Sequence, residues 1–138
     1  MLDVRTGKLR WYRSIVPKDS HDWDLTHAMP LFIATINGKP RRLVTTVGKD
    51  GMLRVLDPDT HAIMYTTAVT TIENAATPVT TTPRRDCPGV FGGVESSGPS
   101  YSAQTDMLYV PAVDWGATFS ANAEPGLRSL SGQRPRSS

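Results

Sequence analysis

Short apolar runs alternate with polar turns between residues 31 and 67. Four of these runs have the length of a β-strand: Leu31–Ile36, Arg42–Val47, Met52–Leu56 and Ala62–Thr67. The segments between them are rich in Asn, Gly, Asp and Pro, and Asn37-Gly38 is a pair that tolerates positive φ in a tight hairpin. Because such short connections force neighbouring strands to pair antiparallel, the pattern predicts a four-stranded meander over residues 31–67.

A repeated turn extends this picture beyond the meander. Asp3 lies eight residues before Trp11 and Asp57 lies eight residues before Tyr65, and the two copies are 54 residues apart. The first copy leads into a predicted strand, Leu9–Val16. A period near 50 built of strands and turns is typical of β-propeller repeats. The predicted fold class is therefore all-β, a fragment of a β-propeller with about one four-stranded antiparallel blade plus parts of two neighbours.

The residue types in the repeat have clear structural roles. Asp3 is suited to accept backbone N–H groups within its own turn, and Gly7 supplies a positive φ. Trp11 is large enough to fill the gap between adjacent sheets, with its indole N–H reaching a carbonyl. In the second copy His61 stands where the first has Gly7.

The remainder of the chain sets the predicted domain limits. Residues 68–100 form a long segment rich in proline and glycine, and a loop of this length usually has a function or covers something. Met107–Pro111 is a further strand that begins the next blade. We therefore expect a partial propeller over residues 1–120, with its central blade at 31–67. Residues 121–138 carry too few apolar side chains to offset their ordering entropy and are predicted to be a disordered tail.

Composition excludes several function classes. The 138 residues carry a net charge of +2. The sequence has no basic stripe interleaved with aromatic residues, the pattern that would indicate nucleic-acid binding. No run approaches the length of a membrane span, and no apolar region of a signal peptide follows Met1. The single cysteine, Cys87, excludes an internal disulfide and a cysteine-based zinc site.

One cluster of metal-ligating residue types lies in the connection 17–30. His21, Asp22, Asp24 and His27 fall within seven residues, which is compatible with a metal site. No standard metal-binding spacing is present, however. The favoured interpretation is a loop whose carboxylates accept backbone N–H groups while Trp23 packs inward.

Seven short segments occur in order across roughly residues 1–120: LDVRTGKLRW at 2–11, HDWD at 21–24, VGKDG at 47–51, VLD at 55–57, CPG at 87–89, GGV at 92–94 and YVPAVDW at 109–115. Taken together, and in this order, they resemble the PQQ-dependent alcohol dehydrogenases, which are eight-bladed quinoprotein propellers.

The resemblance implies periplasmic oxidation of a small alcohol or sugar by PQQ, with a calcium ion that holds the cofactor. Lys49 stands where the family has a Lys or Arg beside the quinone oxygens, where a cation would stabilise developing negative charge. Without the resemblance, Lys49 would be interpreted as an ordinary solvated turn lysine. Asp114 and Trp115 end a strand that borders the cofactor in the family. Val113 and Ser96 depart from the family pattern, since an Asn and a Trp are expected there.

Other family elements have no counterpart in the chain, namely the catalytic Asp, the calcium ligands, the adjacent-cysteine ring and the tryptophan under the cofactor. The expectation is therefore a fragment of a PQQ-dependent alcohol or sugar dehydrogenase that contributes part of the PQQ-binding propeller and is inactive alone. An alternative is a non-catalytic β-propeller repeat module for protein–protein binding. A third possibility is a product that does not fold stably, because repeat units bury their faces only against neighbours.

Overall fold

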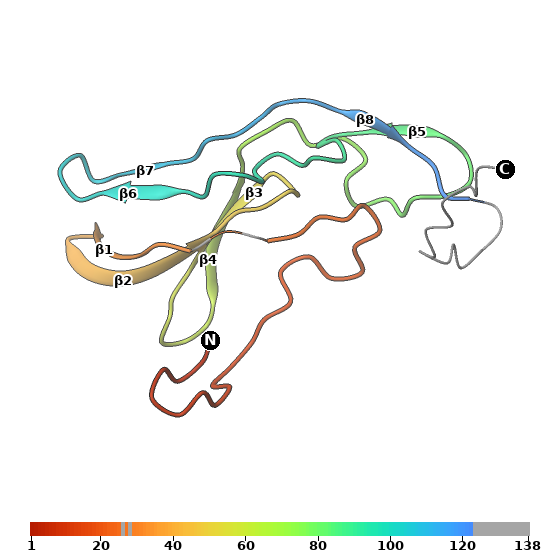
Figure 1. The fold of residues 1–138 in the computed structure, drawn as a ribbon. Coiled ribbons are helices and arrows are strands. Elements are labelled where there is room, and N and C mark those ends of the chain that lie inside the picture. The colour runs from red at the N-terminus through yellow and green to blue at the C-terminus, as the bar shows by residue number, and fades with distance from the viewer. Residues whose placement is uncertain (26, 28, 123–138) are drawn as a thin grey trace, which may run out of the picture.

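The computed structural model describes residues 1–25, 27 and 29–122, and within them all regular structure is β-strand. The eight strands are β1 (Leu31–Ile36), β2 (Lys39–Thr46), β3 (Met52–Leu56), β4 (Ile63–Ala68), β5 (Arg84–Asp86), β6 (Ser100–Ser102), β7 (Met107–Tyr109) and β8 (Ala117–Phe119). Figure 1 shows the first four as one sheet, with the β6–β7 hairpin above β1 and β2.

The central sheet has the predicted meander order β1-β2-β3-β4, with every pair antiparallel. The first hairpin turn is formed by Asn37 and Gly38, both with positive φ (52° and 72°), as the residue pair predicts. β2 begins at Lys39, earlier than the predicted Arg42. Pro40 is tolerated there because this part of β2 pairs with β1 alone, and β3 joins only from Val44 onward.

The buried core lies where the central sheet meets the segments that follow it. Val47, Leu53 and Val94 form a buried cluster, and three partly buried side chains pack against it: Val69, Leu108 and Val110. Phe32 of β1 and Tyr101 of β6 stack with ring centroids 4.1 Å apart, which joins the β6–β7 hairpin to the edge of the sheet. The buried core therefore combines side chains of the central sheet and its flanks with side chains from residues 94–110.

The two copies of the repeated turn have the same geometry. Asp3 Oδ1 accepts the N–H groups of Arg5 and Thr6, and Asp57 Oδ1 accepts those of Asp59 and Thr60 in the same way. The glycine position has a positive φ in both copies, 68° at Gly7 and 63° at His61. The predicted turn chemistry is confirmed, and the second copy holds this backbone with a histidine.

The predicted strand Leu9–Val16 is wrong. An isolated bridge between Leu2 and Leu9 forms, and Arg10 N donates to the carbonyl of Met1 at 3.0 Å beside it, but residues 10–16 make no strand. Trp11 nevertheless packs between repeats, as expected, with its ring stacked on that of His61 at a centroid distance of 4.2 Å. The predicted indole hydrogen bond is not made, since Trp11 Nε1 has no partner among the described residues.

The long segment 68–100 contains one short strand, β5, which pairs with β8, and it ends on the first residue of β6. The sequence did not reveal β5, β6 and β8, because strands of three residues are too short to show an alternating pattern, whereas β7 lies within the predicted strand Met107–Pro111. Of the predicted disordered tail, residues 123–138 lie outside the described residues. Ala121 donates a hydrogen bond to the carbonyl of Thr80 at 2.7 Å.

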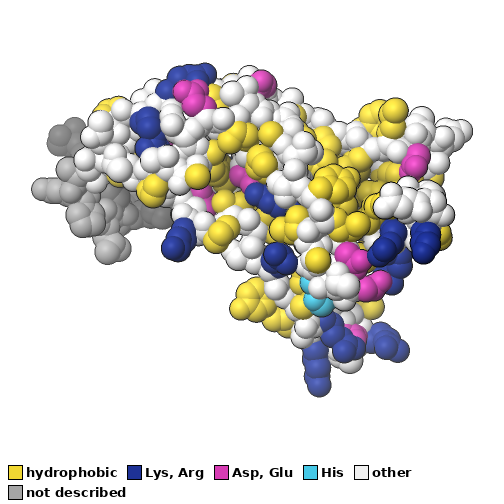
Figure 2. Space-filling model, turned by 180° about the vertical axis from the view of Figure 1, so that it is seen from behind, with side chains coloured by type: hydrophobic (Ala, Val, Ile, Leu, Met, Phe, Trp, Pro, Cys, Tyr) yellow, Lys and Arg dark blue, Asp and Glu magenta, His cyan; other side chains and the backbone are white. Residues whose placement is uncertain are grey.

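The surface retains many apolar side chains. Figure 2 shows hydrophobic side chains gathered in several patches over one face of the molecule. Five such residues on β1, β4 and β7 are at least half exposed: Leu31, Ile33, Tyr65, Met107 and Tyr109. In the part of the chain that the structure describes, no helix has the length and apolar character needed to cross a membrane.

Candidate functional site

Lys49 lies in the turn between β2 and β3, where Gly51 N donates to Gly48 O across the turn. Its backbone is held on both sides: Lys49 N donates to the carbonyl of Asp24 at 3.1 Å, and Lys49 O accepts the N–H of Gly93 at 2.9 Å. The residue is only 6% exposed. An ordinary solvated turn lysine is therefore not what the structure contains.

Three carboxylates surround the Lys49 ammonium. Nζ lies 3.2 Å from Asp22 Oδ2, 3.3 Å from Asp24 Oδ2 and 3.4 Å from Glu95 Oε1. Burial by itself would lower the pKa of Lys49. The hydrogen bonds to Asp22 and Asp24, with the charges of Asp22 and Glu95, outweigh that effect and raise the pKa above its ordinary value. Lys49 is therefore a fixed positive charge at neutral pH.

Gly92 allows the glycine-rich loop to lie directly on Lys49. Its φ is +73°, and a Cβ added there would come within 2.3 Å of Lys49 Cα and Cβ. The Gly92 carbonyl in turn accepts a hydrogen bond from Trp115 Nε1 at 3.1 Å. The Phe91 and Trp115 rings stack nearly parallel, with centroids 5.3 Å apart. The loop thus connects the turn that contains Lys49 to the Phe91–Trp115 pair. This is possible because the glycines have no side chain and let the two backbones approach closely.

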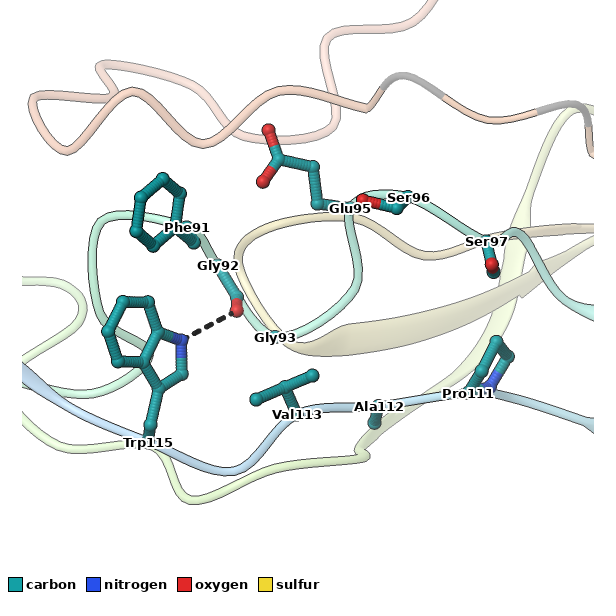
Figure 3. A pocket seen from close by; sticks show the side chains of 10 residues that line it. All are labelled: Phe91, Gly92, Gly93, Glu95, Ser96, Ser97, Pro111, Ala112, Val113 and Trp115. Carbon is teal, nitrogen blue, oxygen red and sulfur yellow. Dashed lines mark hydrogen bonds between the residues drawn. The ribbon is translucent and has the colours of Figure 1, made fainter.

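An open pocket of about 550 Å³ lies beside this arrangement. Its lining comes from two segments, shown in Figure 3: Phe91, Gly92, Gly93, Glu95, Ser96, Ser97, Pro111, Ala112, Val113 and Trp115. In Figure 3 the Phe91–Trp115 pair forms one end of the pocket, and Val113 lies on the side formed by residues 111–115, across from Glu95 and Ser96. A flat aromatic surface and a mostly apolar wall suit a planar ring system.

The three predicted cofactor residues occupy different positions relative to this pocket. Trp115 lines it, and Lys49 adjoins it through Glu95, which is both a lining residue and an ion-pair partner of the lysine. Asp114 is not among the lining residues, and its carboxylate accepts hydrogen bonds from Thr71 N at 2.9 Å and Thr71 Oγ1 at 3.0 Å, in the segment after β4; its cofactor role stays a prediction.

The two predicted departures from the family pattern, Ser96 and Val113, both line the pocket. Sequence reasoning missed Phe91 and Glu95. The only available signal was their position in a long glycine-rich segment that was expected to cover something.

The metal-ligating residue types in the connection 17–30 do not converge. His21 Nε2 lies 3.0 Å from Asp86 Oδ2, and His27 Nε2 lies 3.1 Å from the carbonyl of Val94. Asp22 and Asp24 both face Lys49. Across the described residues, no group of three or more His, Cys, Asp or Glu side chains is placed to hold a metal ion.

Trp23 packs inward, as expected, and is 6% exposed. Its ring stacks on that of His21 with centroids 4.1 Å apart. The carboxylate that accepts backbone N–H groups in this loop is Asp19, which binds the N–H groups of His21 and Trp23. The loop interpretation is therefore right for Trp23, whereas Asp22 and Asp24 bind an ammonium instead.

A buried ion pair anchors the same loop to β5. Asp86 is fully buried and accepts hydrogen bonds from Arg84 Nε at 2.6 Å and Arg84 Nη2 at 2.9 Å, in addition to its contact with His21. The guanidinium of Arg84 lowers the pKa of Asp86 below its ordinary value against the opposing effect of burial, and His21 adds to the lowering. The contact between His21 and Asp86 ties the loop that carries Asp22 and Asp24 to β5, and Arg84 of the same strand holds Asp86 in place.

Comparison with known proteins relates this geometry to one group of enzymes. The family model for the PQQ glucose/ethanol/alcohol dehydrogenase β-propeller domain matches residues 1–67. The quinohemoprotein alcohol dehydrogenase of Comamonas testosteroni is 31% identical over 126 residues, which is 80% of this chain and 18% of that protein. The lanthanide-dependent methanol dehydrogenase of Methylacidiphilum fumariolicum (strain SolV) is 28% identical over 122 residues, which is 77% of this chain and 20% of that protein.

Solved structures agree with these sequence matches. The crystal structure of the Comamonas testosteroni quinohemoprotein alcohol dehydrogenase superposes with a TM-score of 0.76 at 26% identity, covering 85% of this chain and 19% of that one. A europium-containing methanol dehydrogenase superposes with a TM-score of 0.67 at 27% identity, covering 78% and 21%. The chain therefore spans about one fifth of the length of the relatives it matches.

Proposed function

The chain belongs to the PQQ-dependent alcohol dehydrogenase family, as part of its β-propeller, and on this basis we propose that it forms one wall of a PQQ-binding site. The observation that carries the proposal is the position of Lys49, a buried and protonated lysine beside a pocket that ends in a stacked aromatic pair. PQQ, when bound, supplies the quinone that accepts the two electrons removed from an alcohol.

The residues present fit one side of such a group. PQQ is a planar aromatic anion, and the ring of Trp115 with that of Phe91 offers a flat surface of matching shape. Val113 and Ala112 would border such a ring with apolar side chains. The Lys49 ammonium, held next to the pocket by Glu95, supplies a fixed positive charge for a quinone oxygen.

The individual roles follow from this fit. We assign the ring-bordering role to Trp115 and the charge-stabilising role to Lys49. The third expected residue, Asp114, precedes Trp115 in the chain and is hydrogen-bonded to Thr71. The family includes lanthanide-dependent and europium-containing members, so the expected calcium is one of several ions compatible with the complete site. The proposal assigns no metal ligand to the described residues.

The proposal extends to the setting of the whole protein: a small alcohol or sugar as substrate and a periplasmic location, both of which the family resemblance implies. It assigns no catalytic residue to the present chain. The purified chain, supplied with PQQ, calcium or a lanthanide, and a primary alcohol, is expected to show no reduction of an artificial electron-accepting dye. Sustained dye reduction would refute the view that this chain contributes only a wall of the site.

Binding is the direct test. We expect PQQ to be retained by the purified chain in equilibrium dialysis, and we expect Lys49→Met to weaken that retention because the ammonium is removed while the length of the side chain is kept. Lys39→Met is the matched control, because Lys39 is an exposed residue of β2 that does not line the pocket and its substitution removes the same charge. Equal retention by the two variants would remove Lys49 from the proposal.

A second candidate function is a non-catalytic repeat module that binds another protein. The observation that favours it is the set of five half-exposed apolar side chains on β1, β4 and β7. Replacement of Ile33 and Tyr65 by serine should then abolish binding to a candidate partner and leave PQQ retention unchanged. Unchanged partner binding in that double variant would exclude this surface.

A further inference from the structure

Negative charge predominates around Lys49. Asp22, Asp24 and Glu95 each place a carboxylate oxygen 3.2–3.4 Å from its Nζ. At neutral pH carboxylates are ordinarily ionised, so three negative charges surround one positive charge. The ammonium of Lys49, beside a pocket that is proposed to hold an anion, is therefore already surrounded by three carboxylates.

Glu95 differs from the two aspartates in one respect. Asp22 and Asp24 belong to the connection 17–30, none of whose described residues lines the pocket, whereas Glu95 lines the pocket itself. Figure 3 shows Glu95 on the same loop as Phe91 and Gly92, with its side chain at the border of the pocket. A ligand in the pocket therefore meets the Glu95 carboxylate before it meets the lysine.

The backbone around Lys49 makes this order of contacts rigid. Lys49 is hydrogen-bonded to Asp24 on one side and to Gly93 on the other, and Gly92 is packed on its Cα and Cβ. The lysine cannot move toward the pocket as a unit. Only the exchange of one carboxylate partner for another oxygen brings its ammonium into contact with a ligand.

We infer that Glu95 is a specificity-determining residue that sets the affinity of this pocket for anions by competing with the ligand for Lys49. The inference rests on the proposed function, and it specifies which anions the proposed pocket binds well. A ligand with one oxygen near Lys49 and few other negative charges binds with little opposition. A ligand with several carboxylates, such as PQQ, binds more weakly than the lysine alone would allow, because Glu95 repels it.

The test compares PQQ binding by the full chain and its variants in equilibrium dialysis. Glu95→Gln keeps the size of the side chain and removes its charge, and it is expected to tighten PQQ binding about tenfold. Glu73→Gln is the matched control, because Glu73 pairs with exposed Arg85 outside the pocket and its substitution removes the same charge. Glu95→Asp retains the charge and should bind PQQ as the wild type does.

A second measurement follows Lys49 without any ligand. Brief treatment with acetic anhydride, followed by mass spectrometry, reports how readily the Lys49 amine reacts. Because the carboxylates stabilise the protonated form, Glu95→Gln should raise the acetylation rate of Lys49 several-fold, and Glu73→Gln should leave it unchanged.

The outcomes separate the inference from the proposed function. Tighter binding by Glu95→Gln alone, with a difference that shrinks at high salt, supports the inference. Equal PQQ affinity for Glu95→Gln and the wild type, with weaker binding by Lys49→Met, overturns it and leaves the proposed function standing. If no variant binds PQQ, the proposed function fails, and an unchanged acetylation rate in Glu95→Gln then also overturns the claim that Glu95 restrains Lys49.

Discussion

The buried carboxylate of Asp86 gives the sharpest test of how the site is held together. Asp86 receives two hydrogen bonds from Arg84 and one contact from His21, and it has no exposed surface. Asp86→Asn keeps the shape of the side chain and removes its charge. The guanidinium of Arg84, which is about three-quarters buried, then loses its counter-ion.

The expected loss follows from that geometry. Breaking a buried ion pair by removing one partner costs about 3–5 kcal/mol. Arg84 retains the carbonyl of Thr77 as an acceptor at 2.8 Å and is partly in contact with solvent, so the lower end of that range applies, about 3 kcal/mol. For a chain of this size about 4 °C of melting temperature corresponds to 1 kcal/mol, which gives a decrease of about 12 °C.

The same contact predicts a dependence on pH. The pKa of Asp86 is lower in the folded protein than in the unfolded chain, because Arg84 and His21 stabilise the ionised form. Its contribution to stability is therefore complete above about pH 5 and is lost as the pH falls through the lowered folded pKa. The wild type should lose stability between about pH 5 and pH 2, and Asp86→Asn should lose less over that range.

Urea unfolding followed by circular dichroism, at pH 7 and at a series of lower pH values, measures both effects. Asp59→Asn is the control, since Asp59 is 70% exposed and lies 3.5 Å from Arg42, and we expect it to cost less than about 0.5 kcal/mol. Two results would contradict the reasoning: a loss for Asp86→Asn no greater than that for Asp59→Asn, or identical acid profiles for Asp86→Asn and the wild type.

Two further predictions concern backbone positions with positive φ. Gly92→Ala should destabilise the fold by at least about 1 kcal/mol in urea unfolding and weaken PQQ retention, because the added Cβ meets Lys49 at 2.3 Å; unchanged binding would mean that the loop relaxes freely. His61→Ala should cost about 1 kcal/mol, since it removes the ring on which Trp11 stacks, while His61→Gly should cost less because glycine relieves the left-handed backbone; a larger cost for glycine than for alanine would contradict this account.

Local chemistry accounts for what the sequence predicted well. The Asn37-Gly38 turn, the two aspartate turns and the strands that they separate depend on residues within a few positions of one another, so the pattern is sufficient to place them. β1 and β3 have the predicted bounds. The predicted strand Leu9–Val16 failed for the opposite reason, because a strand requires a partner and alternation says nothing about whether one exists.

The site depends on contacts between distant segments, and these could not be predicted from local patterns. Lys49 is buried because Asp22, Asp24 and Glu95, up to 46 residues away in the sequence, converge on its ammonium. Family resemblance selected Lys49 and Trp115, but it gave no indication that Glu95 joins them. It also gave no indication that the carboxylate of Asp114 forms hydrogen bonds to Thr71.

The contact between Trp11 and His61 bears on how such a protein can grow. Each repeat carries both an aspartate turn and, eight residues later, an aromatic side chain, and in the first repeat that side chain covers the turn of the second. A gene segment that is duplicated in tandem would therefore bring its own docking surface with it. New units could be added one at a time during evolution without changes to the existing ones. Later substitutions at the turn, such as histidine for glycine at position 61, would then alter each contact between neighbouring repeats separately.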